Sequence, residues 1–463
     1  MKRLYFVWAV LVATAAKSWS CSGTTPMDYN AYSLFNPDVC GHKDYALFYR
    51  GYASPTEIGY AFTQFLSADN AEYWKRATGY PGSIEEVVKG VEETDEQDVA
   101  AMEAFVRGTV APASNPFIRH LIQTDRRSAA AYLLLAKRCE PHVNRVFNWF
   151  DPESSQEPDK AAMRALKDEA LAAMSEHPEF KHRFLFQAVR LAHYAGDYAE
   201  ALQLLEKHSV AENDPLHARL LRHKAGALIK LGRIVEGYAI VAQMFARPGW
   251  NVAAFMDFRP TRETFNELVA SDKITPETRA WMHVLWGLKN GYEFTLEDLK
   301  SAFALAPKSR SAEILLTAMT RRMESALLLH RLNQSFGLHA DAQPESAVRK
   351  ESWWVRLWKA IVRFFKSVFG LSEDEKPSSS SSGAANPDYE QILADLELFR
   401  QFLAKWPDDN FVRVAEQYLA FLAGDFSAAE KTVTGDEPTT AQSRMIAALA
   451  SISEPEPKLV AQI

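Results

Sequence analysis

The chain lacks most of the features by which enzymes and nucleic-acid-binding proteins are usually identified. Its 463 residues carry 52 Lys and Arg against 59 Asp and Glu, for a net charge of -7, whereas phosphate contacts need a basic surface. No HExxH, GxSxG, Walker or CxxC motif occurs. We therefore expect no nucleic-acid partner, no metal and no cofactor, and we predict that the chain is not an enzyme. An enzyme with an unrecognised site stays open as an alternative.

A hydrophobic run long enough to span a membrane is also missing from the N-terminus. Lys2 and Arg3 precede an apolar run from Leu4 to Ala16, and small residues follow up to Ser20. A basic start, a short apolar stretch and small residues are typical of a secretory signal peptide, and the run is short for a span. We predict an exported protein of the periplasm or cell envelope of a Gram-negative bacterium. The alternative is a buried first helix.

Cysteine is scarce, with only Cys21, Cys40 and Cys139. Cys21 directly follows the expected cleavage region, where bacterial lipoproteins carry their lipidated cysteine, although Ser18-Trp19-Ser20 fits that signal poorly. If Cys21 is acylated, Cys40 and Cys139 can form a disulfide in an oxidising compartment. If it is not, Cys21 can pair with Cys40 and leave Cys139 as a thiol. The sequence thus leaves an outer-membrane lipoprotein as one alternative.

Strand-like alternation is absent as well, and helical signals take its place. Ser54-Pro55-Thr56-Glu57 and Ser83-Ile84-Glu85-Glu86 are capping boxes. Ser128 to Cys139 has helical periodicity and should end at Glu140-Pro141. Before them, Tyr29 to Tyr60 is rich in aromatic and turn residues and predicts an irregular N-terminal cap. The fold class is therefore predicted to be all-α.

From about residue 158 the expected helices come in pairs. Phe184–Ala195 stops at Gly196-Asp197, and Tyr198–His208 follows almost at once. Leu216–Leu231 stops at Gly232, and Ile234–Phe245 returns. The two glycines lie 36 residues apart, close to the period of about 34 residues that is typical of tetratricopeptide (TPR) units.

The residues at these turns resemble the tetratricopeptide repeat family. Gly196-Asp197-Tyr198 with Ala201 and Leu205 matches the turn glycine, the following aromatic and the small residue where paired helices touch. The second copy has Gly232, Gly237 and Pro248, and a third has Gly424-Asp425-Phe426 with Ala429. Leu185 and Ile234 replace expected aromatics, and the pair Trp281–Lys289 with Leu296–Leu305 is degenerate. The resemblance covers about a third of the chain.

This resemblance implies a helical-hairpin solenoid that binds partner proteins. One hairpin cannot bury its apolar face alone, so neighbours stack and leave an extended binding surface. The faces of the first helices should supply the groove. The predicted contributors are Gln187, Arg190, His193, Arg222 and Lys230.

A basic and aromatic stretch lies at residues 352–371. At 100° per residue its four cations fall within an arc of about 80°, and three Trp and three Phe lie elsewhere. A cationic stripe opposite aromatic rings is typical of a helix lying in an anionic membrane interface, and the cations argue against a span. The residues expected at the interface are Trp353, Trp354, Arg356, Leu357, Trp358, Lys359, Ile361, Arg363, Phe364, Phe365, Lys366 and Val368.

Two alternatives to an interfacial anchor stay open for this stretch. The helix could dock on the solenoid or enter a partner's groove. It could also be the insertion element of a membrane-active, pore-forming or toxin-like system. In each case the Ser-rich segment at 378–382 has linker composition.

The predicted organisation has five parts, and the predicted function is that of an envelope-associated TPR-like scaffold or adaptor. The parts are a signal peptide at 1–20, a cap region with helices at 21–125, TPR-like repeats at 126–335, a linker carrying the amphipathic helix at 336–388, and C-terminal helical repeats at 389–463.

Overall fold

The computed structural model describes residues 34–35, 42–49, 55–143, 159–289, 296–307, 309, 311–335, 389–406 and 409–453. Within these residues every regular element is a helix, which confirms the all-α class. The predicted signal peptide, Cys21, Cys40 and the whole basic aromatic stretch at 352–371 lie outside the described residues.

The chain divides into two compact units. The first contains residues 1–32 and 36–321, and the second contains residues 322–463 together with Ser33–Phe35. This boundary lies within helix α16 (Ser311–Ser335). The other helices of the first unit are η3 (Lys43–Tyr49), α2 (Pro55–Thr78), α3 (Ile84–Val91), α4 (Glu96–Val106), α5 (Pro116–Gln123), α6 (Arg127–Val143), α7 (Lys160–Glu176), η5 (Pro178–Phe180), α8 (Lys181–Ala195), α9 (Tyr198–Lys207), α10 (His217–Lys230), α11 (Ile234–Phe245), α12 (Asn251–Asp257), α13 (Arg262–Ala270), α14 (Pro276–Lys289) and α15 (Leu296–Leu305). The second unit adds α18 (Tyr389–Leu403), α19 (Asn410–Ala423), α20 (Phe426–Ala429) and α21 (Glu437–Ser453).

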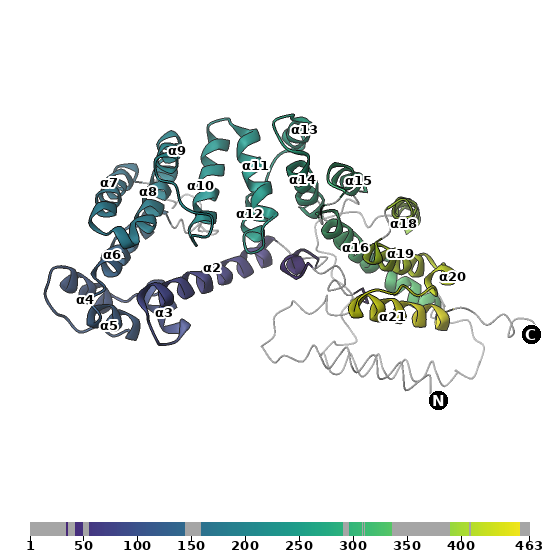
Figure 1. Ribbon diagram of the computed structural model, residues 1–463, viewed down its shortest axis with the longest axis horizontal. Helices are drawn as coiled ribbons and strands as arrows, with labels where there is room; N and C mark the ends of the chain where they lie inside the picture. The colour runs from purple at the N-terminus through teal and green to yellow at the C-terminus, as the bar shows by residue number, and fades with distance from the viewer. Residues whose placement is uncertain are drawn as a thin grey trace, which may run out of the picture. The chain divides into compact units, whose positions relative to one another are not determined.

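Helices that follow one another in the first unit pack as neighbours. The pairs α7 and α8, α10 and α11, and α14 and α15 make the most extensive contacts. The alternate helices α6, α8 and α10 also touch one another, so they form one layer of a row (Figure 1). The predicted pairs at 184–208 and 216–245 are confirmed to within a few residues.

Three glycine turns close the hairpins in the same way. Gly196, Gly232 and Gly424 have φ of 90°, 79° and 83°, in the left-handed region where a Cβ is disfavoured. The next residue in each turn donates its N–H to a carbonyl five residues back, at 2.9 Å in all three, as in a Schellman turn. Glycine at these positions is therefore required by backbone conformation.

Close packing between the helices of a pair explains a fourth glycine. A Cβ on Gly237 would lie 2.5 Å from Ile229 Cγ1 and 2.9 Å from the Ala225 carbonyl oxygen. The corresponding residues of the other copies, Ala201 and Ala429, are fully buried. The three positions predicted to be small are thus small because neighbouring helices touch there.

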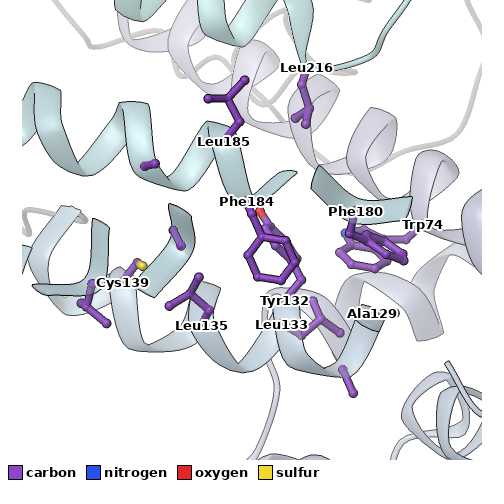
Figure 2. Packing of buried hydrophobic residues seen from close by; sticks show 14 of the residues in the cluster. Trp74, Ala129, Tyr132, Leu133, Leu135, Cys139, Phe180, Phe184, Leu185 and Leu216 are labelled. Atoms are coloured by element: carbon purple, nitrogen blue, oxygen red, sulfur yellow. The ribbon is translucent and has the colours of Figure 1, made fainter. Parts of the chain in front are cut away.

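Aromatic side chains fill the core at the start of the row. Trp74 of α2 is fully buried and stacks on Phe180, with ring centroids 5.5 Å apart (Figure 2). Tyr132 of α6 meets Phe184 of α8 edge to face at 5.3 Å. This cluster fastens α2 to α6 and α8.

Residues 42–49 belong to the segment that was expected to form an irregular N-terminal cap, and they pack against later helices of the first unit. Residues 43–49 form the 3-10 helix η3, and the Tyr45 hydroxyl donates to the Phe245 carbonyl at 2.7 Å. The same ring stacks on Trp281, and the His42 ring lies 2.8 Å from the Glu313 carboxylate. These partners follow 200 or more residues later, so no local sequence pattern could indicate them.

Two of the predicted helix starts and one predicted end can be compared with the structure. α2 begins at Pro55, and Ser83 with Glu86 forms the full capping box of α3. The predicted end at Glu140-Pro141 is wrong, because α6 continues through Pro141 to Val143.

Candidate functional site: the first-helix stripe

Four of the five predicted groove residues, all except His193, lie on two rows of side chains, one on α8 and one on α10. On α8, Arg183, Gln187, Arg190 and Tyr194 are spaced by four, three and four residues, which places them on one face. On α10, Arg219, Arg222 and Lys230 form the matching row. Since α8 and α10 touch, we call these seven residues the first-helix stripe.

Helix α2 covers the N-terminal end of the stripe. The Arg183 guanidinium lies 3.8 Å from the centroid of the Tyr73 ring and 4.7 Å from that of Trp74, and it donates to Asn70 Oδ1 at 3.0 Å. Arg219 lies 3.9 Å from the Asp69 carboxylate. The first-helix stripe therefore already binds one helix of its own chain, through aromatic rings and short polar side chains. Figure 1 shows α2 passing along the ends of α8 and α10.

Gln187 is less accessible than a groove residue should be. Its side chain is 3% exposed and donates to the Tyr132 hydroxyl at 3.0 Å. It connects α8 to α6, so its role is in packing between first helices.

Arg222 in the middle of the stripe is bound to the last residue of α12. It makes two hydrogen bonds to the Asp257 carboxylate, at 2.6 and 2.8 Å. Burial works against the charge of Arg222, but the bonds and charge of Asp257 outweigh it and raise the pKa of the guanidinium. A two-point Arg–carboxylate pair of this kind fixes geometry as well as charge.

His193 lies beside the stripe and faces His223. The two ring centroids are 5.1 Å apart, and a Cβ on Gly226 would lie 2.8 Å from His193 Cε1. Burial lowers the pKa of both imidazoles, and that of His223 is lowered well below its ordinary value. His223 is further disfavoured as a cation by His193, Arg222 and Arg190. The pair is therefore neutral at pH 7.

The C-terminal end of the stripe is open. Tyr194 is 39% exposed, which is unusual for a large aromatic ring on a packed helix, and Lys230 is exposed. The stripe as a whole carries five cations, Arg183, Arg190, Arg219, Arg222 and Lys230. Arg219 lies near Asp69, and Arg222 pairs with Asp257. Such a surface suits a partner segment that offers carboxylates and apolar contact area.

Three stripe residues were missed by the sequence predictions, and one of them, Tyr194, lies one turn after the predicted Arg190. Arg183 and Arg219 lie one turn before the predicted Gln187 and Arg222, on the same faces. Extending each helical projection toward the start of its helix would have included them. Their aromatic and acidic partners on α2 lie more than 100 residues earlier and give no local signal.

Of the three cysteines, Cys139 lies within the described residues. It lies on α6 as a free thiol that is fully buried in the hydrophobic core. The structure therefore lacks the disulfide of the alternative that pairs Cys139 with Cys40. Burial raises the pKa of the thiol to about 12, which leaves it protonated and unreactive at neutral pH.

The described residues contain no group of three or more His, Cys, Asp or Glu placed to hold a metal ion. Nor does any helix within them combine the length and hydropathy needed to cross a membrane. Comparison with protein-family models, with curated proteins and with solved structures gives no match for this chain. The resemblance to tetratricopeptide repeats therefore stays a prediction from the turn residues.

Proposed function

We propose that this chain is an exported, envelope-associated scaffold with TPR-like helical hairpins that binds a partner protein along the first-helix stripe. The observation that carries the proposal is the seating of α2, because Arg183 and Arg219 hold it through Trp74, Asn70 and Asp69. A surface that binds a helix of its own chain has the chemistry to bind another. The partner segment would carry acidic residues and contact the open end at Tyr194 and Lys230.

Photocrosslinking tests this proposal in the native host. With p-benzoylphenylalanine at Tyr194, we expect one discrete adduct, and with the same group at Val110, which is 91% exposed, we expect none. Lys230→Glu should weaken the Tyr194 adduct several-fold, because it places a negative charge against an acidic partner, at a cost of roughly 1 kcal/mol or more.

Lys224→Glu is the matched control for that charge reversal. It lies on the same helix, about 120° further round, and should leave the adduct unchanged. Adducts that are equally strong at Val110, or that ignore Lys230→Glu, would count against the stripe as the binding surface.

Membrane association is the second part of the proposal and depends on the sequence at 352–371. Four cations on one face, opposite three Trp and three Phe, favour binding at an anionic membrane surface, at about 1 kcal/mol per cation. A lipid at Cys21 would add a second attachment.

Liposome flotation of unlipidated residues 22–463 tests this part. We expect the chain to float with anionic vesicles, to sink in high salt, and to remain at the bottom with neutral vesicles. Deletion of 352–371 should abolish flotation. If the intact chain never floats, the stretch is not an anchor. If the chain floats and also releases a dye trapped in the vesicles, the pore-forming alternative is favoured over a passive anchor.

A further inference from the structure

A short piece of the N-terminal region belongs to the C-terminal unit. Ser33–Phe35 is grouped with residues 322–463, whereas residues 1–32 and 36–321 form the other unit. Phe35 is fully buried there, although it precedes Tyr418 by more than 380 residues. Leu34 and Phe35 are not helical and do not belong to any helix of the unit. The piece therefore occupies the unit as a bound peptide would.

Side chains of the unit bind the backbone of this piece at three points. The N–H groups of Leu34 and Phe35 both donate to Glu324 Oε1, at 2.5 and 3.1 Å. The Leu34 carbonyl accepts from Gln442 Nε2 at 2.8 Å. Hydrogen bonds from side chains to a peptide backbone are independent of peptide sequence, so these three bonds would hold any segment of the right conformation.

The Phe35 ring supplies the selectivity. It stacks on Tyr418 at 5.5 Å with an interplanar angle of 23°, and it is tilted against Phe411 at 6.3 Å. A ring enclosed between two aromatic residues buries a large apolar area, and such anchors dominate binding energies.

The residues around the piece are fixed by a buried network of their own. The Tyr418 hydroxyl donates to the same Glu324 oxygen at 2.5 Å, which orients the carboxylate toward the peptide. Behind it, Gln417 donates to the Ala429 and Ser443 carbonyls and accepts from the Ser443 hydroxyl at 2.7 Å. A site held by such bonds can keep its shape when its occupant is exchanged.

We propose that the C-terminal unit is a recognition site for a non-helical segment in which an apolar residue is followed by phenylalanine, and that Leu34 and Phe35 are its resident ligand. A partner protein that carries the same two-residue chemistry binds by displacing them. The buried Glu324 carboxylate requires two adjacent backbone N–H groups, so a proline at either position is excluded. This site is separate from the first-helix stripe and does not depend on it.

The test uses the full-length chain with Phe35→Ala and a fluorescent peptide copying residues 30–38. The peptide should bind this variant and raise its melting temperature. It should bind the unaltered chain far more weakly, because a tethered ligand is present at an effective concentration of roughly millimolar. A peptide with alanine in place of phenylalanine should bind at least about tenfold more weakly.

Glu324→Gln in the Phe35→Ala background should also weaken binding by roughly tenfold or more, since it removes a charged acceptor. Lys405→Gln, an exposed change on the same unit, is the control and should have no effect. Failure of the peptide to bind or stabilise the Phe35→Ala chain would overturn the proposal. If the unaltered chain forms a dimer by exchanging residues 33–35, the proposal of an external partner would be overturned, because a second copy of the chain would then be the occupant.

Discussion

Replacing Trp74 by alanine is expected to lower the free energy of unfolding of the first unit by about 3–5 kcal/mol. The side chain is fully buried and contacts Phe117, Tyr132 and Phe180. Its removal leaves a cavity and also takes one aromatic face from the buried Arg183 guanidinium. Urea unfolding followed by circular dichroism at 222 nm measures the change.

Val110→Ala is the control for Trp74→Ala, because that side chain is 91% exposed and should change stability by no more than about 0.5 kcal/mol. Trp74→Phe keeps a ring in the cluster and should fall between the two. A Trp74→Ala chain as stable as the control would show that α2 is not held on the row by this side chain.

The second large effect is expected with pH. Burial lowers the pKa of His193 and His223 below the ordinary value of 6.5, so the unfolded chain takes up protons first as the pH falls. The stability from the neutral pair is fully present above pH 6.5 and is lost progressively below it. Each histidine should contribute up to about 1.4 kcal/mol per pH unit.

The cations that face the pair strengthen this dependence. Arg190 and Arg222 disfavour a charge on His223, and Lys230 disfavours one on His193. Urea midpoints measured from pH 7.5 to 5.0 should therefore fall more steeply for the unaltered chain than for the double variant His193→Gln/His223→Gln. His142→Gln, in the last turn of α6, serves as the control. Parallel slopes for the double variant and the unaltered chain would assign the dependence to other groups.

The hairpin turns could be predicted because their signals are local. A glycine followed by a polar residue and an apolar helix start indicates a left-handed C-cap, and Gly196, Gly232 and Gly424 all have that conformation. The same holds for the capping box at Ser83 and Glu86. Pro141 led to the wrong prediction of a helix end. The proline ring disturbs the turn that precedes it, so α6 still continues past Pro141 to Val143.

The stripe could be predicted only in part. Helical projection assigned Arg190, Arg222 and Lys230 to first-helix faces, but a projection gives only the direction of a side chain and does not identify the residue that it contacts. Whether a side chain on that face meets solvent, as Lys230 does, or a buried tyrosine, as Gln187 does, depends on a helix elsewhere in the chain. That is why Gln187 proved to be a packing residue.

The sequence by itself determined an all-helical chain, the positions of its paired helices and the glycines that turn them, because caps, left-handed turns and helical periodicity involve residues within one or two turns of each other. Only the tertiary structure decided that α2 lies on the row of first helices and that Phe35 enters the C-terminal unit. Those contacts join residues 113 apart for Asn70 and Arg183 and 408 apart for Leu34 and Gln442. Apolar burial drives such pairings, and it is non-directional. An apolar residue in the sequence therefore does not indicate which distant residue it will contact.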